Sequence, residues 1–138
     1  MTGAAMSGLT ALPRSFLAFD FGTKRIGVAS GNTITRTATP LRTVAAEGDA
    51  RFAAIAALLT EWQPDALVVG VPFHPDGAPH DNTERARRFA RQLHGRFRLP
   101  VHEVDERYST TEAASGGARD LDAASAAIIL NQFLSTLE

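Results

Sequence analysis

The stretch that decides the fold is FLAFDFGTKRIGVASG, residues 16–31. Residues 16–21 and 25–30 each have the apolar character of a short strand, and Gly22 lies in the turn between them. The two segments predict an antiparallel start to a sheet. Asp20 ends the first strand, where an ionised carboxylate needs a partner because burial removes its hydration. Two interpretations are open: Asp20 caps the turn or pairs with Lys24 or Arg25, or it binds a ligand.

The remaining elements predict a mixed α/β sheet with helices on both faces. Hydrophobic periodicity separates the strands from the helices, and glycine and proline mark the loops. After the first two strands we expect a strand at 35–44, interrupted or ended by Pro40, and then a helix at 49–62 with apolar residues at 52, 55, 58, 59 and 62. A strand at 65–71 and a loop at 72–82 follow, and then a helix at 83–97 capped by Asp81 or Asn82. The last elements are a strand at 99–106, a short helix opened by the capping box 109–112, and a helix from Asp122 to about residue 136.

Length and composition predict one folded domain. The chain has 138 residues, of which 44% are hydrophobic, so we expect a disordered tail at 1–15 and a single domain at 16–138. The absence of cysteine excludes disulfides and thiolate chemistry. With no signal peptide and no apolar run long enough for a bilayer, we expect a cytoplasmic protein without a membrane partner. A net charge of -1 means that any polyanion must be bound by a local patch.

Three acids predict a metal site. Ligands gather at the carboxyl ends of strands in open α/β sheets, so Asp20 and Glu106 converge if their strands are neighbours. Because side chains alternate along a strand, only one of Asp105 and Glu106 faces that site. Asp122 lies on the apolar stripe of the last helix, although an acid there can also simply cap the helix. Oxygen ligands without cysteine or a histidine cluster suit two Mg²⁺ or Mn²⁺ ions, which can hydrolyse a phosphodiester.

A local basic patch accompanies these acids. Between Glu84 and Arg98 the sequence has six arginines and one acid, and Lys24 and Arg25 directly follow Asp20. Arginines at these positions can hold phosphates, although a solvated helix face is the alternative. His74 lies in the loop after an apolar strand, where it either contacts a phosphate or is an ordinary loop residue.

Four sequence blocks carry a resemblance to a known family. They are DFGTKRIGVA (20–29), VVGVPFHPDG (68–77), VDERYSTTEA (104–113) and LDAASAAIILNQFL (121–134), and together they resemble the YqgF/RuvX family. That family has an RNase H-like fold and is described as Holliday junction resolvases and as candidate nucleases that mature the 5′ end of pre-16S rRNA. The resemblance implies an RNase H-like mixed sheet, with three antiparallel N-terminal strands followed by two further strands.

The same resemblance implies a set of site residues. Asp20, Glu106 and Asp122 match the three family acids that act in catalysis and metal binding, with Asp105 as an alternative to Glu106. We expect the substrate, pre-rRNA or branched DNA, to contact a set of basic residues and one histidine: Lys24, Arg25, Arg85, Arg88, Arg107 and His74. Cleaving a four-way junction needs two symmetric cuts and hence a homodimer, whereas trimming rRNA does not.

The sequence departs from the family pattern at two places, and two alternative functions are also open. His74-Pro75 stands where the family usually has Asn-Met, and residues 114–121 form a shortened version of a basic segment. We expect the shortened basic segment to weaken or alter substrate binding. The alternatives are a nucleic-acid adaptor without catalysis and a fragment of an actin-like ATPase, whose first hairpin has a similar Asp-x-Gly-Thr pattern.

Overall fold

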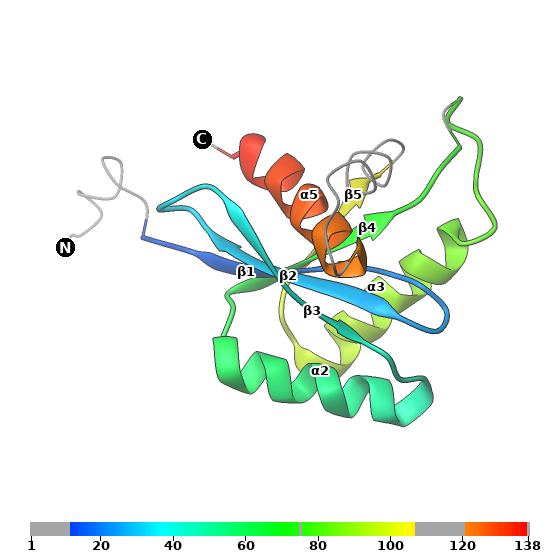
Figure 1. Ribbon diagram of the computed structural model, residues 1–138, viewed down its shortest axis with the longest axis horizontal. Helices are drawn as coiled ribbons and strands as arrows, with labels where there is room; N and C mark the ends of the chain where they lie inside the picture. The colour runs from blue at the N-terminus through cyan, green and yellow to red at the C-terminus, as the bar shows by residue number, and fades with distance from the viewer. Residues whose placement is uncertain (1–11, 75, 107–120, 138) are drawn as a thin grey trace.

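The computed structural model describes residues 12–74, 76–106 and 121–137 (Figure 1). Five strands form one mixed sheet in the order β3-β2-β1-β4-β5. The strands are β1 (Ser15–Asp20), β2 (Ile26–Asn32), β3 (Ala38–Val44), β4 (Ala66–Val71) and β5 (Val101–Asp105). The helices are α2 (Gly48–Trp62), α3 (Thr83–Phe97) and α5 (Leu121–Ser135).

The strand pairing confirms the expected sheet. The pairs β1/β2 and β2/β3 are antiparallel, whereas β1/β4 and β4/β5 are parallel. Three antiparallel strands at the N-terminal end are therefore followed by two further strands, as the sequence predicted. Because β1, β4 and β5 run in the same direction, their carboxyl ends lie along one edge of the sheet.

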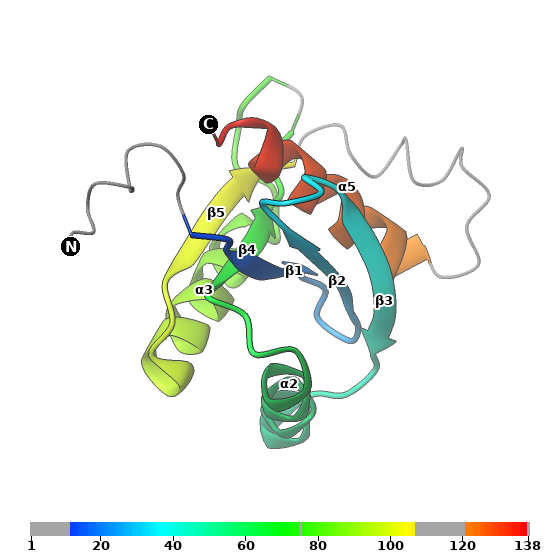
Figure 2. The same cartoon turned by 90° about the vertical axis from the view of Figure 1, so that its left-hand side faces the viewer.

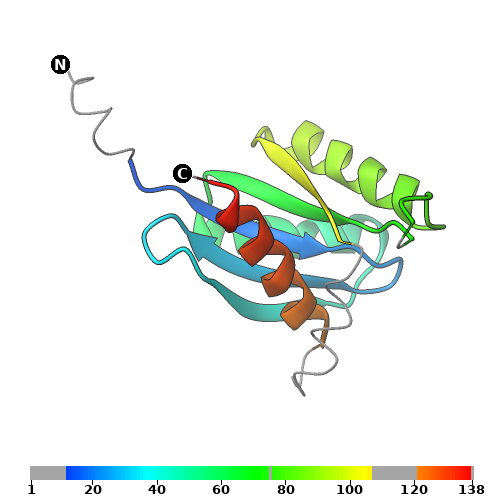
Figure 3. The same cartoon turned by 90° about the horizontal axis from the view of Figure 1, so that it is seen from above.

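Helices cover both faces of the sheet (Figures 2 and 3). One core lies between the sheet and helices α2 and α3, and it includes Leu17 and Phe19 of β1. The other core lies under α5 and includes Phe16 and Ala18 of the same strand. Side chains of successive residues in β1 thus pack into opposite cores, because they alternate between the two faces.

Several local expectations need correction. Trp62, expected on the buried side of its helix, is 42% exposed, whereas Arg51 is buried at 8% exposure. Asn82 occupies the N-cap position of α3, but its side chain makes no cap hydrogen bond. Its Oδ1 instead accepts a hydrogen bond from Arg85 Nη1 at 3.1 Å.

The edge strand β3 continues through Pro40, where an interruption was expected. Its pairing with β2 has a register irregularity between Val28 and Ala29, and Ala29 faces Pro40. A proline has no N–H to donate, so it fits at an edge strand or a bulge. The expected helix from the capping box 109–112 and most of the expected tail, residues 1–11, lie outside the described residues.

None of the helices in the described residues is long and apolar enough to cross a bilayer.

Gly27 sets how closely α5 approaches the sheet. A Cβ built at Gly27 would lie 1.8 Å from the backbone oxygen of Asp122, which is closer than two non-bonded atoms can approach. The first turn of α5 therefore rests directly on the backbone of β2. This contact places Asp122 next to the end of β1, because Gly27 pairs with Asp20 in the sheet.

We expect Gly27→Ala to destabilise the protein by about 2 kcal/mol or more, because α5 must move away from the sheet. Urea denaturation of the two proteins measures this difference. Gly95→Ala is the matched control, since a Cβ at Gly95 in α3 meets nothing within 4 Å. The control should gain about 0.5 to 1 kcal/mol from its higher helix propensity. Equal effects of the two substitutions would contradict the close contact.

Candidate active site

The carboxyl edge of the parallel strands brings Asp20 and Glu106 together. Asp20 is the last residue of β1. Glu106 directly follows β5, and its backbone N–H donates to the carbonyl of Val71 at 3.1 Å, which continues the β4/β5 pairing by one residue. Strand alternation places Glu106 on the same face as Val104, which packs against the core under α5. Asp105, the alternative acid, lies at the intervening position and therefore faces the opposite side.

Two glycines make room for the acids around Asp20. In the sheet, Asp20 pairs with Gly27 of β2 and Gly70 of β4, so both neighbours on its own face lack a side chain. A Cβ at Gly70 would lie 3.0 Å from Glu106 Oε2 and 2.3 Å from Ile129 Cδ1. The Glu106 carboxyl group thus lies over Gly70, beside Asp20.

The two carboxyl groups share a proton. Glu106 is 7% exposed, and its side chain is hydrogen-bonded to Asp20. Burial, the charge of Asp20 and this hydrogen bond raise the pKa of Glu106 from 4.5 to about 9. Burial also raises the pKa of Asp20 from 3.8 to about 6, against the hydrogen bond from Glu106, which lowers it. Protonated Glu106 therefore donates to the Asp20 carboxylate.

One buried oxygen of this pair is unsatisfied. Glu106 Oε2 has no hydrogen-bond partner among the described residues. Leaving a buried polar atom without a partner costs about 1 to 3 kcal/mol. An oxygen in this position is a ready ligand for a cation.

Asp122 lies close to the pair but is held by Arg25. Its Oδ2 lies 3.1 Å from Arg25 Nε in an ion pair, and its side chain is 32% exposed. The charge of Asp122 contributes to the raised pKa of Asp20. Within residues 12–74, 76–106 and 121–137, no three histidine or acidic side chains are grouped closely enough to hold a metal ion. The geometry thus joins two of the three expected acids directly and places the third within electrostatic range.

The expected basic residues occupy different places. Arg25 lies beside the acids, and Lys24 is exposed in the same turn. Arg85 and Arg88 are exposed on α3, which packs on the face opposite α5. Arg107 lies outside the described residues.

Part of the positive charge on α3 is already paired. Among the described residues, three of its arginines form ion pairs with acids, namely Arg87 with Glu103, Arg91 with Glu84 and Arg96 with Asp49. The helix is therefore less positive than its sequence suggests. Arg85 and Arg88 have no acidic partner within 4 Å among the described residues.

His74 lies in the exposed loop after β4. Its ring centroid is 5.1 Å from that of His80, and its backbone N–H donates to the carbonyl of Ala78 at 2.9 Å. These contacts close the loop on itself, and no described contact joins His74 to the acidic pair.

Arg51 is a positioning residue that the sequence did not reveal. Its Nη2 donates to the carbonyls of Gly22 and Thr23 at 3.0 and 2.8 Å, and its Nε donates to the carbonyl of Ala46 at 3.0 Å. The guanidinium thereby ties the turn that carries Arg25 to helix α2. Backbone carbonyls leave no sequence signal, so only the three-dimensional contacts identify this residue.

A protein-family model matches nearly the whole chain. The model described as "RuvX: Holliday junction resolvase" matches residues 14–136, nearly the whole chain. The chain belongs to the RuvX family. This result confirms the resemblance carried by the four sequence blocks.

Two relatives are similar to this chain over most of their length. A protein of Polaromonas sp. is 66% identical over 137 residues, covering 99% of each chain. One of Albidiferax ferrireducens is 70% identical over 124 residues, covering 90% of this chain and 80% of the relative. Both are named as candidate pre-16S rRNA nucleases.

A solved structure supports the RNase H-like fold of this RuvX family member. RuvC of T. thermophilus, solved in complex with a Holliday junction substrate, superimposes with a TM-score of 0.55 at 15% identity. The match covers 89% of this chain and 94% of RuvC. At this identity the likeness concerns the fold alone.

We expect the metal-free protein to lose stability as the pH rises from about 4.5 towards 9, because folded Glu106 keeps a proton that the unfolded chain releases. Removing this ionisable group with Glu106→Gln should stabilise the metal-free protein at pH 8 by on the order of 1 kcal/mol or more. Thermal melts in EDTA between pH 5 and 9 measure both effects.

Glu103→Gln serves as the control for that experiment, since Glu103 lies on the same strand but is 43% exposed and only ion-paired to Arg87. Its melting temperature should change little across the pH range. A Glu106→Gln variant that is less stable than the parent at pH 8 would contradict the shared proton.

Proposed function

We propose that this chain is a divalent-metal-dependent endonuclease in which Asp20, Glu106 and Asp122 hold Mg²⁺ or Mn²⁺. Membership of the RuvX family makes it a nuclease, a hydrolase that acts on phosphodiester bonds. The observation that carries the metal proposal is the buried acid pair, whose raised pKa values and unsatisfied Glu106 Oε2 indicate a missing positive charge.

The donor set fits a hard divalent cation. Carboxylate oxygens are the ligands that Mg²⁺ and Mn²⁺ prefer, and the chain has no cysteine thiolate to compete with them. A cation at the pair would replace the shared proton and satisfy Glu106 Oε2. When bound, such ions activate a water molecule and stabilise the leaving oxygen of the phosphodiester.

The residues around the acids have separate tasks in this proposal. Asp20 and Glu106, fixed by strands β1 and β5, provide the rigid part of the site. Asp122 completes the ligand set once its ion pair with Arg25 opens, and Arg25 is then free to contact a phosphate. The side chain of Arg25 is 66% exposed, so a phosphate can reach it from solvent.

The substrate that we propose is structured nucleic acid, with the 5′ end of pre-16S rRNA as the first candidate. The names of the close relatives favour this substrate. A four-way DNA junction is the second candidate, favoured by the description of the family. Lys24, in the same turn as Arg25, is exposed, as are Arg85 and Arg88 of α3, and all three can contact phosphates.

We expect Asp20→Asn and Glu106→Gln each to lower cleavage by about 100-fold or more, because the loss of a ligand removes several kcal/mol of transition-state stabilisation. The assay uses pre-rRNA leader, four-way junction, duplex and single strand, each with Mg²⁺, Mn²⁺ or EDTA. Asp49→Asn is the control, since its carboxyl group is fully exposed on α2 away from the site. Full activity of Asp20→Asn would reject the proposal.

The same assay separates the two alternative functions. An adaptor would bind nucleic acid in a salt-dependent manner and show no metal-dependent cleavage by the parent protein. An actin-like ATPase fragment would bind ATP in calorimetry, which we do not expect.

The oligomeric state should decide between the two substrates. Symmetric cleavage of a junction needs two active sites, so a junction resolvase must be a dimer at working concentration. Sedimentation with and without a junction measures this. A strict monomer under both conditions would leave rRNA processing as the activity, because trimming one strand requires a single site.

A further inference from the structure

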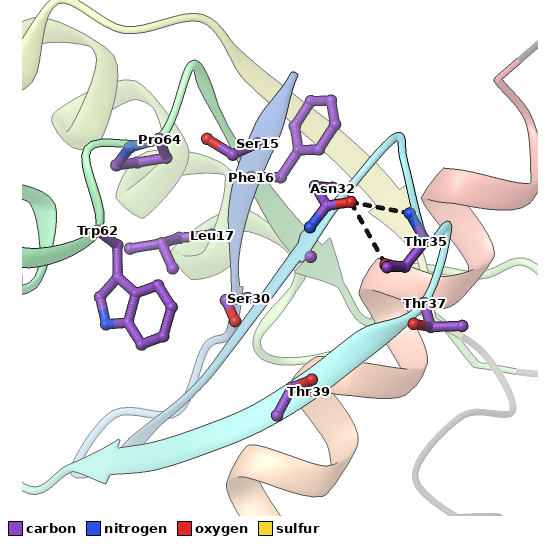
Figure 4. A pocket seen from close by; sticks show the side chains of 11 residues that line it. Ser15, Phe16, Leu17, Ser30, Asn32, Thr35, Thr37, Thr39, Trp62 and Pro64 are labelled. Carbon is purple, nitrogen blue, oxygen red and sulfur yellow. Dashed lines mark hydrogen bonds between the residues drawn. The ribbon is translucent and has the colours of Figure 1, made fainter. Parts of the chain in front are cut away.

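A pocket opens at the end of the sheet far from the acids, and it has a volume of about 270 Å³ (Figure 4). It lies between the C-terminal end of α2 and the hairpin that joins β2 to β3. Figure 4 shows Trp62, Pro64 and Leu17 on one side, Thr37 and Thr39 on the other, and Ser30 between them.

Trp62 offers a flat aromatic surface at this pocket. It is the only tryptophan of the chain and is 42% exposed. Helix α2 ends at Trp62, and Gln63 then takes a left-handed conformation with φ of 45°, which turns the chain away towards β4. The helix therefore stops before it covers this part of the sheet, and the indole remains accessible beside the pocket.

The floor of the pocket is polar where the core face of the sheet is otherwise apolar. Leu17, Ser30 and Thr39 are cross-strand neighbours in one row on the face that α2 and α3 cover. In the next row of β1 and β2, the same face carries Phe19 and Val28, both fully buried. Among the described residues, the hydroxyl groups of Ser30 and Thr39 make no hydrogen bond, so they are available to a ligand.

The lining of the pocket is also neutral. It consists of aromatic, aliphatic, hydroxyl and amide groups, and no charged side chain of the described residues lines it. A phosphate or carboxylate ligand would find no counter-charge here. A flat, uncharged ligand with hydrogen-bonding groups at its rim matches the combination of an indole face with free hydroxyls.

We propose that this pocket binds an unpaired nucleobase of the nucleic-acid substrate, stacked on Trp62 and hydrogen-bonded at its edge by Ser30 and Thr39. The inference rests on the proposed function, because that function supplies nucleic acid as the ligand. Every base has a π-face, and stacking on an aromatic side chain is the usual way in which proteins hold unpaired bases.

The pocket is an anchor that lies outside the catalytic centre. Ser15 at the pocket and Asp20 at the acids are the two ends of β1, which places them about 16 Å apart at the usual rise per residue. The pocket also opens on the face opposite the acids. An unpaired base held here would therefore position a structured substrate from a distance. Loss of the contact between the base and the pocket should raise KM more than it lowers kcat.

Because Trp62 is the only tryptophan, its fluorescence reports on the pocket directly. We expect single-stranded oligoribonucleotides, titrated into the full chain in EDTA, to quench the emission with saturation, and the same titration with oligodeoxynucleotides tests whether the sugar matters. Thr39→Val and Ser30→Ala should each weaken this binding about 5-fold or more. Thr60→Ala is the control, because Thr60 lies on α2 outside the pocket and bonds only its own helix.

The outcomes separate this inference from the nuclease proposal. Quenching that Thr39→Val weakens, in a protein that cleaves nothing, would support the pocket and reject the nuclease. Cleavage with a KM that is unchanged in Trp62→Ala would reject the pocket and leave the nuclease standing. Absence of quenching by either oligonucleotide, or quenching that Thr39→Val and Ser30→Ala leave unaltered, would also overturn the base-binding assignment.

Discussion

The arrangement of the acidic edge depends on the absence of side chains on both sides of Asp20. Gly27 on one neighbouring strand lets the backbone of α5 touch the sheet, and Gly70 on the other lets Glu106 lie over β4. A Cβ at Gly27 would overlap the backbone of Asp122, and a Cβ at Gly70 would crowd the side chains of Glu106 and Ile129, so a larger residue at either position would disturb the acids. The three expected acids are therefore only part of the site. The site also needs the absence of side chains at Gly27 and Gly70, which leaves room for the acids.

Burying two carboxyl groups side by side lowers stability, and the two cores of the domain offset that cost. Phe16 and Ala18 pack under α5, while Leu17 and Phe19 pack under the other two helices, so β1 is fixed from both faces up to the residue before Asp20. A strand held in this way cannot move its last residue away from Glu106. The repulsion is relieved instead by a shared proton and by the ion pair of Asp122 with Arg25. Both are contacts that a cation and a phosphate can replace.

Sequence reasoning was most successful where local pattern and global packing agree. The sheet and its three helices, including α3 over residues 83–97, were predicted from periodicity. The closeness of Asp20 and Glu106 followed from the rule about strand ends. The ion pair of Asp122 and the buried bonds of Arg51 could not be predicted, because each joins residues whose distance depends on the packing of a whole helix. Trp62 was wrongly expected to be buried for a related reason, since periodicity does not show where a helix extends beyond the part of the sheet that it covers.

The proline in the outer strand β3 has a consequence for how copies of this protein can meet. An outer strand normally presents a row of N–H and carbonyl groups on which another chain can build, and this is a common route to aggregation. Pro40 lacks the N–H, and the irregular pairing beside it disturbs the spacing of the neighbouring groups. The sheets of two copies therefore cannot readily pair through the edge strand β3. A dimer that cuts a junction would therefore have to form through helices or through the opposite border at β5.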